Sequence, residues 1–221
     1  MSRSSKLTIA LAAVAVMLVT GALGAFADFP AAPKDTAAMM KGTQTAVLAG
    51  GCFWGMEGVF ERLKGVVDVT AGYSGGAKET AFYEMVGSGS TGHAESVQIH
   101  FDPTKISYGT ILKVFFSVAH DPTQLNYQGP DHGTQYRSVI FYANDGQKQV
   151  AEAYIKALDA AKVYPQKIVT QVVPLKAFYA AEDYHQKFLD KNPDYPYIVY
   201  WDLPKLANLK HMYPDLVVEG M

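Results

Sequence analysis

Apolar residues change their spacing repeatedly between residues 45 and 188 of this 221-residue chain, and this alternation restricts the fold more than any other feature. Short segments with strand-like apolar patterns alternate with longer segments whose apolar residues recur at helical spacing. We predict strands over 45–49, 66–71, 95–101, 138–142 and 168–173, and helices over 52–63, 107–119, 147–161 and 181–188. Such mixed order indicates an α+β fold in which helices pack against one sheet.

The N-terminal segment has the pattern of a targeting sequence. Arg3 and Lys6 precede a continuous apolar run over 7–26, and Ala25-Phe26-Ala27 matches the small-residue pattern of a cleavage site. We expect a signal peptide over 1–27, cleaved after Ala27, and an exported protein, periplasmic or secreted. A retained membrane anchor over 7–27 is the alternative, because the run is about as long as a spanning helix requires. Residues 28–42, with prolines and alanines but no periodicity, predict a linker before a single domain over 43–221.

The overall charge gives no sign of a nucleic-acid partner. The formal net charge is -2 at pH 7 and the pI is near 6.3. No run of Lys and Arg interleaved with aromatic residues is present. We therefore expect no nucleic acid among the partners.

Cys52 is the only cysteine, and it lies in "AVLAGGCFWGMEGVF". A lone cysteine forms no internal disulfide, so it is either an apolar filler or a reactive thiol. Met56 and Phe60 belong to an inward helical stripe, and one turn back from Met56 lies Cys52. In a first helical turn, unpaired N–H groups and the helix dipole would lower the thiol pKa from about 8.5. The two preceding glycines allow a sharp turn, but these features alone leave both interpretations open.

Glu95 is the second candidate for chemistry. It is in phase with Val97, Ile99 and Phe101, which form one face of the strand predicted over 95–101. Its carboxyl is thus predicted to point to the apolar side, where desolvation raises an acid's pKa and allows it to serve as a general acid. Equally, at the end of a strand, Glu95 could bend out to water.

Four sequence blocks resemble one enzyme family. They are "GCFWG" (51–55), "TGHAE" (91–95), "DHGTQYRS" (131–138) and "AEDYHQKFL" (181–189). In this order they resemble peptide methionine sulfoxide reductase of the A type, and the resemblance runs from about residue 46 to 193. It implies reduction of methionine S-sulfoxide, free or in proteins.

The resemblance also implies a role for seven residues. Cys52 would attack the sulfoxide sulfur and become a sulfenic acid, and Glu95 would protonate the departing oxygen. The remaining five would complete the site: Tyr83 and Tyr136 would hydrogen-bond that oxygen, Phe53 and Trp54 would enclose the substrate methyl group, and Asp131 would orient the polar side. For the fold, we expect a two-layer α/β sandwich (ferredoxin-like plait) with a mixed sheet, flanking helices and, from Asn192 onward, an irregular C-terminal tail.

The C-terminal segment departs from the family pattern. Many relatives have further cysteines there that attack the sulfenic acid, but this chain has none. An external thiol, thioredoxin-like or small, must then regenerate Cys52. We expect no bound cofactor or metal, and a monomer.

Three other interpretations stay open from the residues alone. A cysteine hydrolase would pair Cys52 with a histidine base, for which His93, His132 and His185 are available. The Glu182-x-x-His185 spacing suggests a metal site, but the second copy that a dinuclear site uses is missing, and we interpret His185 as structural. A non-catalytic binding module is the third alternative, if Cys52 is inaccessible.

Overall fold

A computed structural model of the chain describes residues 29–33, 35 and 42–220. The predicted signal peptide or anchor (1–27) lies outside the described residues, as does most of the predicted linker (28–42). The described part of that linker lies against the domain: Pro30 O accepts a 2.9 Å hydrogen bond from Tyr154 Oη, and the Phe29 ring packs edge-on against Tyr164. Among the described residues, no helix is both long and apolar enough to cross a membrane.

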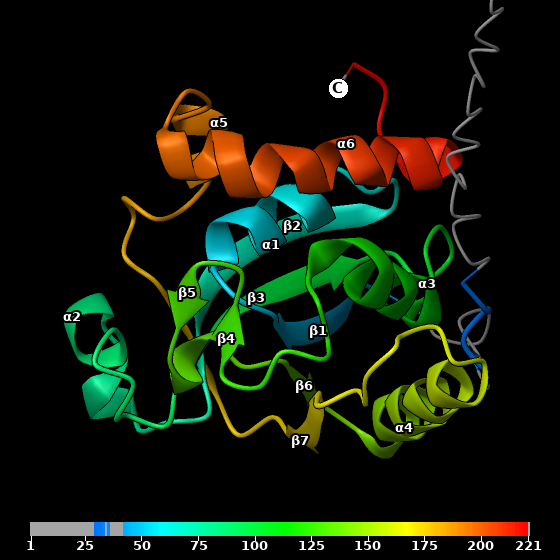
Figure 1. The fold of residues 1–221 in the computed structure, drawn as a ribbon, viewed down its shortest axis with the longest axis horizontal. Helices are drawn as coiled ribbons and strands as arrows, with labels where there is room; N and C mark the ends of the chain where they lie inside the picture. Colours follow the sequence, from blue (N-terminus) through cyan, green and yellow to red (C-terminus); the bar gives the residue numbers. More distant parts are fainter. Residues whose placement is uncertain (1–28, 34, 36–41, 221) are drawn as a thin grey trace, which may run out of the picture.

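A six-stranded sheet in the order β7-β6-β1-β3-β2-β8 forms the centre of the fold (Figure 1). The strands are β1 (Gln44–Ala49), β2 (Val66–Ser74), β3 (Ala94–Phe101), β6 (Val139–Tyr142), β7 (Gln171–Pro174) and β8 (Phe178–Ala180). The pairs β6–β1, β1–β3, β3–β2 and β2–β8 are antiparallel, whereas β6–β7 is parallel. The sheet is therefore mixed, as predicted, and its four central strands have the order of a ferredoxin-like plait.

One face of the sheet carries the main core. The helices that pack there are α1 (Phe53–Glu61), α3 (Tyr108–Val114) and α4 (Asp145–Ala160), and α6 (Leu203–Met212) adds a further layer over α1 (Figure 1). Leu48 on β1 and Ile99 on β3 face these helices, whereas Val47 and Ala49 face a smaller apolar cluster on the other side. The α+β prediction with flanking helices is confirmed.

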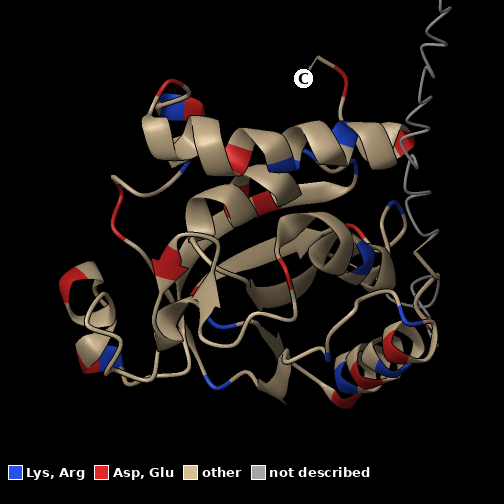
Figure 2. Cartoon of the chain, viewed as in Figure 1, with Lys and Arg blue, Asp and Glu red and all other residues tan. Residues whose placement is uncertain are grey.

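The surface of α4 mixes both charge signs. Its five charged residues, Asp145, Lys148, Glu152, Lys156 and Asp159, alternate in sign along the helix (Figure 2). The Val150 and Tyr154 side chains between them are buried. This division between a charged side and an apolar side is typical of a helix that covers a sheet.

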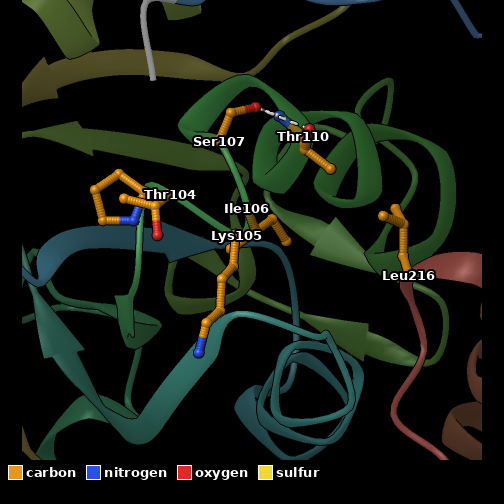
Figure 3. Close-up of a pocket in the computed structure, with 7 residues that line it drawn as sticks. Thr104, Lys105, Ile106, Ser107, Thr110 and Leu216 are labelled. Atoms are coloured by element: carbon orange, nitrogen blue, oxygen red, sulfur yellow. Dashed lines mark hydrogen bonds between the residues drawn. The ribbon is translucent and has the colours of Figure 1, made fainter. Parts of the chain in front are cut away.

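Helix α3 begins where the sequence predicts a helix, and its start is capped. Ser107 Oγ accepts a 3.0 Å hydrogen bond from the Thr110 N–H (Figure 3), which satisfies a donor that the helix leaves free. A surface cavity of about 480 Å³ lies at this end of the helix, lined by Ile106, Ser107, Thr110 and Leu216 among others. The helix continues as a π-helix over Phe115–Ala119, so the predicted extent of 107–119 is nearly correct.

The predicted irregular C-terminal tail is wrong. The chain forms a π-helix over Ile198–Asp202, which leads directly into α6. Pro204 does not prevent this, because it lies in the first turn of α6, where the missing N–H would have no intrahelical partner. Leu209 is fully buried in the core, so tertiary packing stabilises a segment whose composition suggested a loop.

The helix predicted over 181–188 is also wrong. Turns occupy 183–187, and only α5 (Phe188–Lys191) is helical. The Gln186 side chain explains the difference, since it bonds both the N–H and the C=O of Ala71 on β2, at 3.0 and 2.9 Å. Gln186 Nε2 also donates a 2.9 Å hydrogen bond to Ala181 O, a carbonyl that a helix over 181–188 would use in its own backbone hydrogen bonds. Lys187 follows with a positive φ of 55°, which is outside the helical region.

Strand β2 extends beyond its predicted end at residue 71, as far as Ser74. Gly72 makes this possible: a Cβ there would lie 2.3 Å from Tyr179 O and 2.4 Å from the Phe178 ring. Strand β8 thus pairs closely with the end of β2 because Gly72 has no side chain.

Candidate active site

Cys52 is the N-cap residue of α1 rather than part of its first turn, and its side chain is buried. The two preceding glycines bring the neighbouring segments close to it. A Cβ on Gly50 would lie 2.9 Å from the His120 ring, and a Cβ on Gly51 would lie 2.5 Å from Gln128 Cγ. Gly51 also has a φ of +93°, which glycine adopts at little cost. The glycines therefore set both the chain direction and the packing beside the sulfur.

Glu95 points inward from β3, as its phase with Val97 predicts, and is 3% exposed. Its Oε2 atom accepts a 3.1 Å hydrogen bond from the Phe53 N–H at the start of α1. Burial raises the pKa of this carboxyl to about 8, although the Phe53 N–H opposes the shift. At neutral pH most of the Glu95 carboxyl is therefore protonated.

The Cys52 thiol has the opposite shift from the one predicted. Burial raises its pKa well above the usual value, and the negative charges of Glu95 and Asp202 raise it further. The Trp54 N–H favours the thiolate but does not outweigh desolvation. The position of Cys52 at a helix N-terminus is therefore not sufficient to lower its pKa. One N–H of that terminus, that of Phe53, is already bonded to Glu95. In the free protein at neutral pH the sulfur carries its proton.

A cavity of about 200 Å³ brings all seven predicted site residues together. Its lining consists of Cys52, Phe53, Trp54, Tyr83, Glu95, Asp131, Tyr136, Tyr195 and Tyr197. These residues come from the start of α1, the start of β3, α2 (Tyr83–Val86), β5 (Asp131–His132), the 3₁₀-helix over Thr134–Tyr136 and the C-terminal segment. The fold thus assembles, next to the only thiol, two carboxyl groups, several phenols and an aromatic wall.

Trp54 is fixed by the segment between β8 and α6. Its indole stacks on Phe188 with ring centroids 3.8 Å apart and planes 10° from parallel. Its Nε1–H donates a 3.1 Å hydrogen bond to His185 Nδ1. His185 also packs against Phe53 and Tyr83, with ring centroids 4.9 and 4.5 Å apart. His185 therefore holds the aromatic wall of the cavity in place.

Two further phenols that the sequence does not predict, Tyr195 and Tyr197, line the cavity. Tyr197 Oη donates a short hydrogen bond to Asp131 Oδ2, and Tyr195 packs edge-on against Trp54. Desolvation raises the pKa of Asp131, while this hydrogen bond opposes the shift. With 14 tyrosines in the chain, no local pattern separates these two from the tyrosines of the core.

Glu182, which the sequence suggests only as a metal ligand, organises the cavity wall. Its Oε2 atom accepts a 2.9 Å hydrogen bond from Tyr73 Oη, and its Oε1 atom accepts one of 2.9 Å from the Tyr83 N–H. These contacts connect β2 with the start of α2. Within the described part of the chain, no group of three or more His, Cys, Asp and Glu side chains is arranged to hold a metal ion.

The histidines do not form a nucleophile–base pair with Cys52. Both ring nitrogens of His93 are hydrogen-bonded near Gly76 and Ala77. Those of His120, the histidine packed against Gly50, bond Phe115 O and Ser138 Oγ at 2.9 and 2.7 Å. His185 is engaged with Trp54, and His132 stacks on Tyr127. The geometry favours an acid–thiol pair over the Cys–His pair of a hydrolase.

Comparison with known proteins places this arrangement in a family. A family model described as peptide methionine sulfoxide reductase matches residues 44–215. "Peptide methionine sulfoxide reductase MsrA 2" of Mesorhizobium japonicum is 62% identical over 178 residues, 80% of this chain and 91% of that protein. The protein of the same description from Synechocystis is 54% identical over 183 residues, 83% of this chain and 85% of that one. The reduced form of Mxr1 from Saccharomyces cerevisiae superposes with a TM-score of 0.62 at 36% identity, covering 69% of this chain and 87% of that one. The chain belongs to the peptide methionine sulfoxide reductases of the A type.

Proposed function

We propose that the chain reduces methionine S-sulfoxide to methionine, with Cys52 as the nucleophile and Glu95 as the proton donor. The observation that carries this assignment is that Cys52 and a buried acid with a pKa of about 8 line one small aromatic cavity. A sulfoxide is a weak electrophile until its oxygen is protonated, and a carboxyl that keeps its proton at neutral pH can supply it.

The raised thiol pKa fits a coupled proton transfer. Glu95 gives its proton to the sulfoxide oxygen while the Cys52 sulfur forms a bond to the sulfoxide sulfur. The resulting carboxylate accepts the proton that leaves the thiol. The S–O bond then breaks, the oxygen passes to Sγ, and methionine leaves. The balance is one thiol and one sulfoxide giving one sulfenic acid and one thioether, so Sγ is oxidised by two electrons and the substrate sulfur is reduced by two.

The cavity walls match the two ends of the reacting group. The apolar faces of Phe53 and Trp54 suit the methyl group of the substrate, whereas the Tyr83 and Tyr136 hydroxyls can donate to the oxygen. Burial and the nearby Glu95 raise the pKa of both phenols, so both keep the proton that they need as donors. Asp131, held by Tyr197, completes the polar side.

A single-turnover assay on the separated S and R epimers of methionine sulfoxide tests the assignment. Without added thiol, the wild-type chain should release about one methionine per chain from the S epimer and then stop. Cys52→Ser should release none, and the R epimer should give no burst. Full activity of Cys52→Ser, or continued turnover without thiol, would exclude this mechanism.

We infer that the reductant is an external thiol, in solution or on a thioredoxin-like protein. Cys52 is the only cysteine, so the chain has no second thiol with which to close a disulfide. Steady-state methionine release with dithiothreitol and with reduced thioredoxin measures this directly. Absence of recycling by both would contradict the inference.

We also propose that the protein is exported, periplasmic or secreted, and acts as a monomer without bound cofactor. The pattern of residues 1–27 supports export, and the two sulfur centres account for both electrons without a cofactor. N-terminal sequencing of the protein from the producing cells should give Asp28 as the first residue, and sedimentation should give a mass of one chain. An N-terminus at Met1 in the membrane fraction would instead support the anchor.

A further inference from the structure

A second cavity, of about 290 Å³, meets Cys52 from another side. It is lined by Cys52, Val118, His120, Asp121, Gln124, Gln128, Gly129, Pro130, Tyr197, Trp201 and Lys205. Only Cys52 and Tyr197 also line the cavity described above. Glu95, Tyr83 and Tyr136, the groups assigned to the sulfoxide oxygen, are absent from its lining. Cys52 therefore borders two cavities with different linings.

The walls of this second cavity are held by hydrogen bonds. Gln128 Oε1 accepts from the Asp121 N–H at 2.9 Å, and its Nε2 donates to Asp121 O at 3.0 Å. His120 bonds through both ring nitrogens. Gly50 and Gly51 leave the space that the His120 and Gln128 side chains occupy. The cavity is thus part of the folded structure and does not depend on a loop closing.

The two cavities differ in charge. The cavity with Glu95 also contains Asp131, whereas the second contains the Lys205 ammonium, 3.0 Å from Asp202 Oδ1. The Asp121 carboxylate at the second cavity is already occupied by Thr123 and Gln124. Of the two cavities, only the second has an ammonium group in its lining, Lys205, and there it lies with the carboxylates of Asp121 and Asp202. An approaching thiolate can therefore meet a positive charge only in the second cavity.

The chemistry of recycling favours an approach to Cys52 from the side away from Glu95. After methionine leaves, the sulfenic hydroxyl on Sγ lies toward Glu95, which must protonate it for water to leave. Displacement at a sulfur atom proceeds in line, so the attacking thiolate must approach Sγ opposite the S–O bond. The space at Cys52 that lacks Glu95 is the second cavity.

We propose that the second cavity is the route by which the reducing thiol reaches the sulfenic acid of Cys52. The inference rests on the proposed function. A thiolate attacks Sγ, the S–O bond breaks, and the hydroxyl leaves as water with a proton from Glu95, giving a mixed disulfide. A second thiolate then attacks the outer sulfur of that disulfide. This step releases the Cys52 thiolate, which regains its proton, and two reductant thiols have become one disulfide.

Val118→Phe provides the test, because the added ring would fill part of the second cavity without touching the first. Methionine release is measured in two ways: as a single-turnover burst without thiol, and as recycling with dithiothreitol or with reduced thioredoxin. The burst should keep its wild-type rate, while the recycling rate constant should fall at least roughly tenfold. Val199→Phe, which adds the same ring at an exposed position outside both cavities, is the matched control and should change neither.

The two reductants separate the possible sources of the thiol. If the recycling rate constant of Val118→Phe falls with both reductants, both use the second cavity. If it falls with only one of them, the result supports the route for that reductant. Unchanged recycling by both reductants in Val118→Phe with an intact burst would overturn the inference, whereas a missing burst in the wild-type protein would instead overturn the proposed function.

Should Val118→Phe fail to fold, Trp201→Ala decides the question. Trp201 lines the second cavity and is 45% exposed, so its removal should widen the cavity without unfolding the core. Recycling by a bulky monothiol should then increase several-fold at an unchanged burst rate. Recycling equal to that of the wild type would overturn the inference.

Discussion

Glu95 Oε2 accepts a 3.1 Å hydrogen bond from the backbone N–H of Phe53, the residue that follows Cys52. This bond ties the acid on β3 to the start of the helix that holds the nucleophile. It also occupies the Phe53 N–H, a donor at the helix N-terminus that could otherwise stabilise the Cys52 thiolate. The acid and the thiol are therefore coupled through one short piece of backbone.

Glu95→Gln should lower the single-turnover rate of methionine release by roughly 10²- to 10⁴-fold, the usual contribution of a general acid. Gln keeps the shape and an acceptor for the Phe53 N–H but donates no acidic proton. Glu57→Gln is the matched control, since Glu57 is also buried, with a pKa of about 8, but does not line the cavity. An equal loss in both variants would mean that the effect is structural.

The wild-type burst rate should fall as the pH rises through about 8. The pKa of Glu95 is raised to about 8, so the protonated form that donates to the oxygen is present below this pH and is lost above it. Stopped mixing of enzyme and sulfoxide between pH 6 and 10 measures the profile. A rate that instead increases through pH 8 would show that thiol ionisation limits the reaction.

Glu57→Gln should stabilise the fold at alkaline pH. Burial raises the pKa of Glu57 from 4.5 to about 8, so between these values the folded chain retains a proton that the unfolded chain has lost. The wild-type chain therefore loses stability over this range as the pH rises, whereas the Gln variant does not. Thermal unfolding at pH 4 and pH 9 should show similar Tm values at pH 4 and a higher Tm for the variant at pH 9. The opposite order at pH 9 would contradict the buried position of this carboxyl.

Gly51→Ala should destabilise the chain more than Gly42→Ala. Both glycines have a positive φ, of 93° and 78°, so both substitutions carry a backbone cost of about 1–2 kcal/mol. At Gly42 nothing lies within 4 Å of the added Cβ, whereas at Gly51 it would overlap Gln128. The overlap should add about 1–3 kcal/mol, measured by urea unfolding, and should slow the burst by displacing Cys52. Equal destabilisation of the two variants would refute the packing role of Gly51.

The sequence by itself determined the helix and strand order of the core and the inward phase of Glu95, and its resemblance to one family implied that Cys52 and Glu95 act in one site. These features are local: apolar periodicity specifies which face of an element is buried, and the four blocks carry the remaining site residues. The C-terminal helix α6 and the positions of Tyr195 and Tyr197 depended on contacts with distant parts of the chain, which composition does not encode.

Only the tertiary structure decided the protonation of the site and the existence of two cavities at Cys52. The helix N-terminus that the sequence indicates would favour a thiolate. Burial, the charges of Glu95 and Asp202, and the bond between Phe53 and Glu95 outweigh it. Desolvation depends on how many atoms surround a group in space. The segments that surround Cys52 come from across the chain, so its neighbours along the sequence do not predict the direction of its pKa shift.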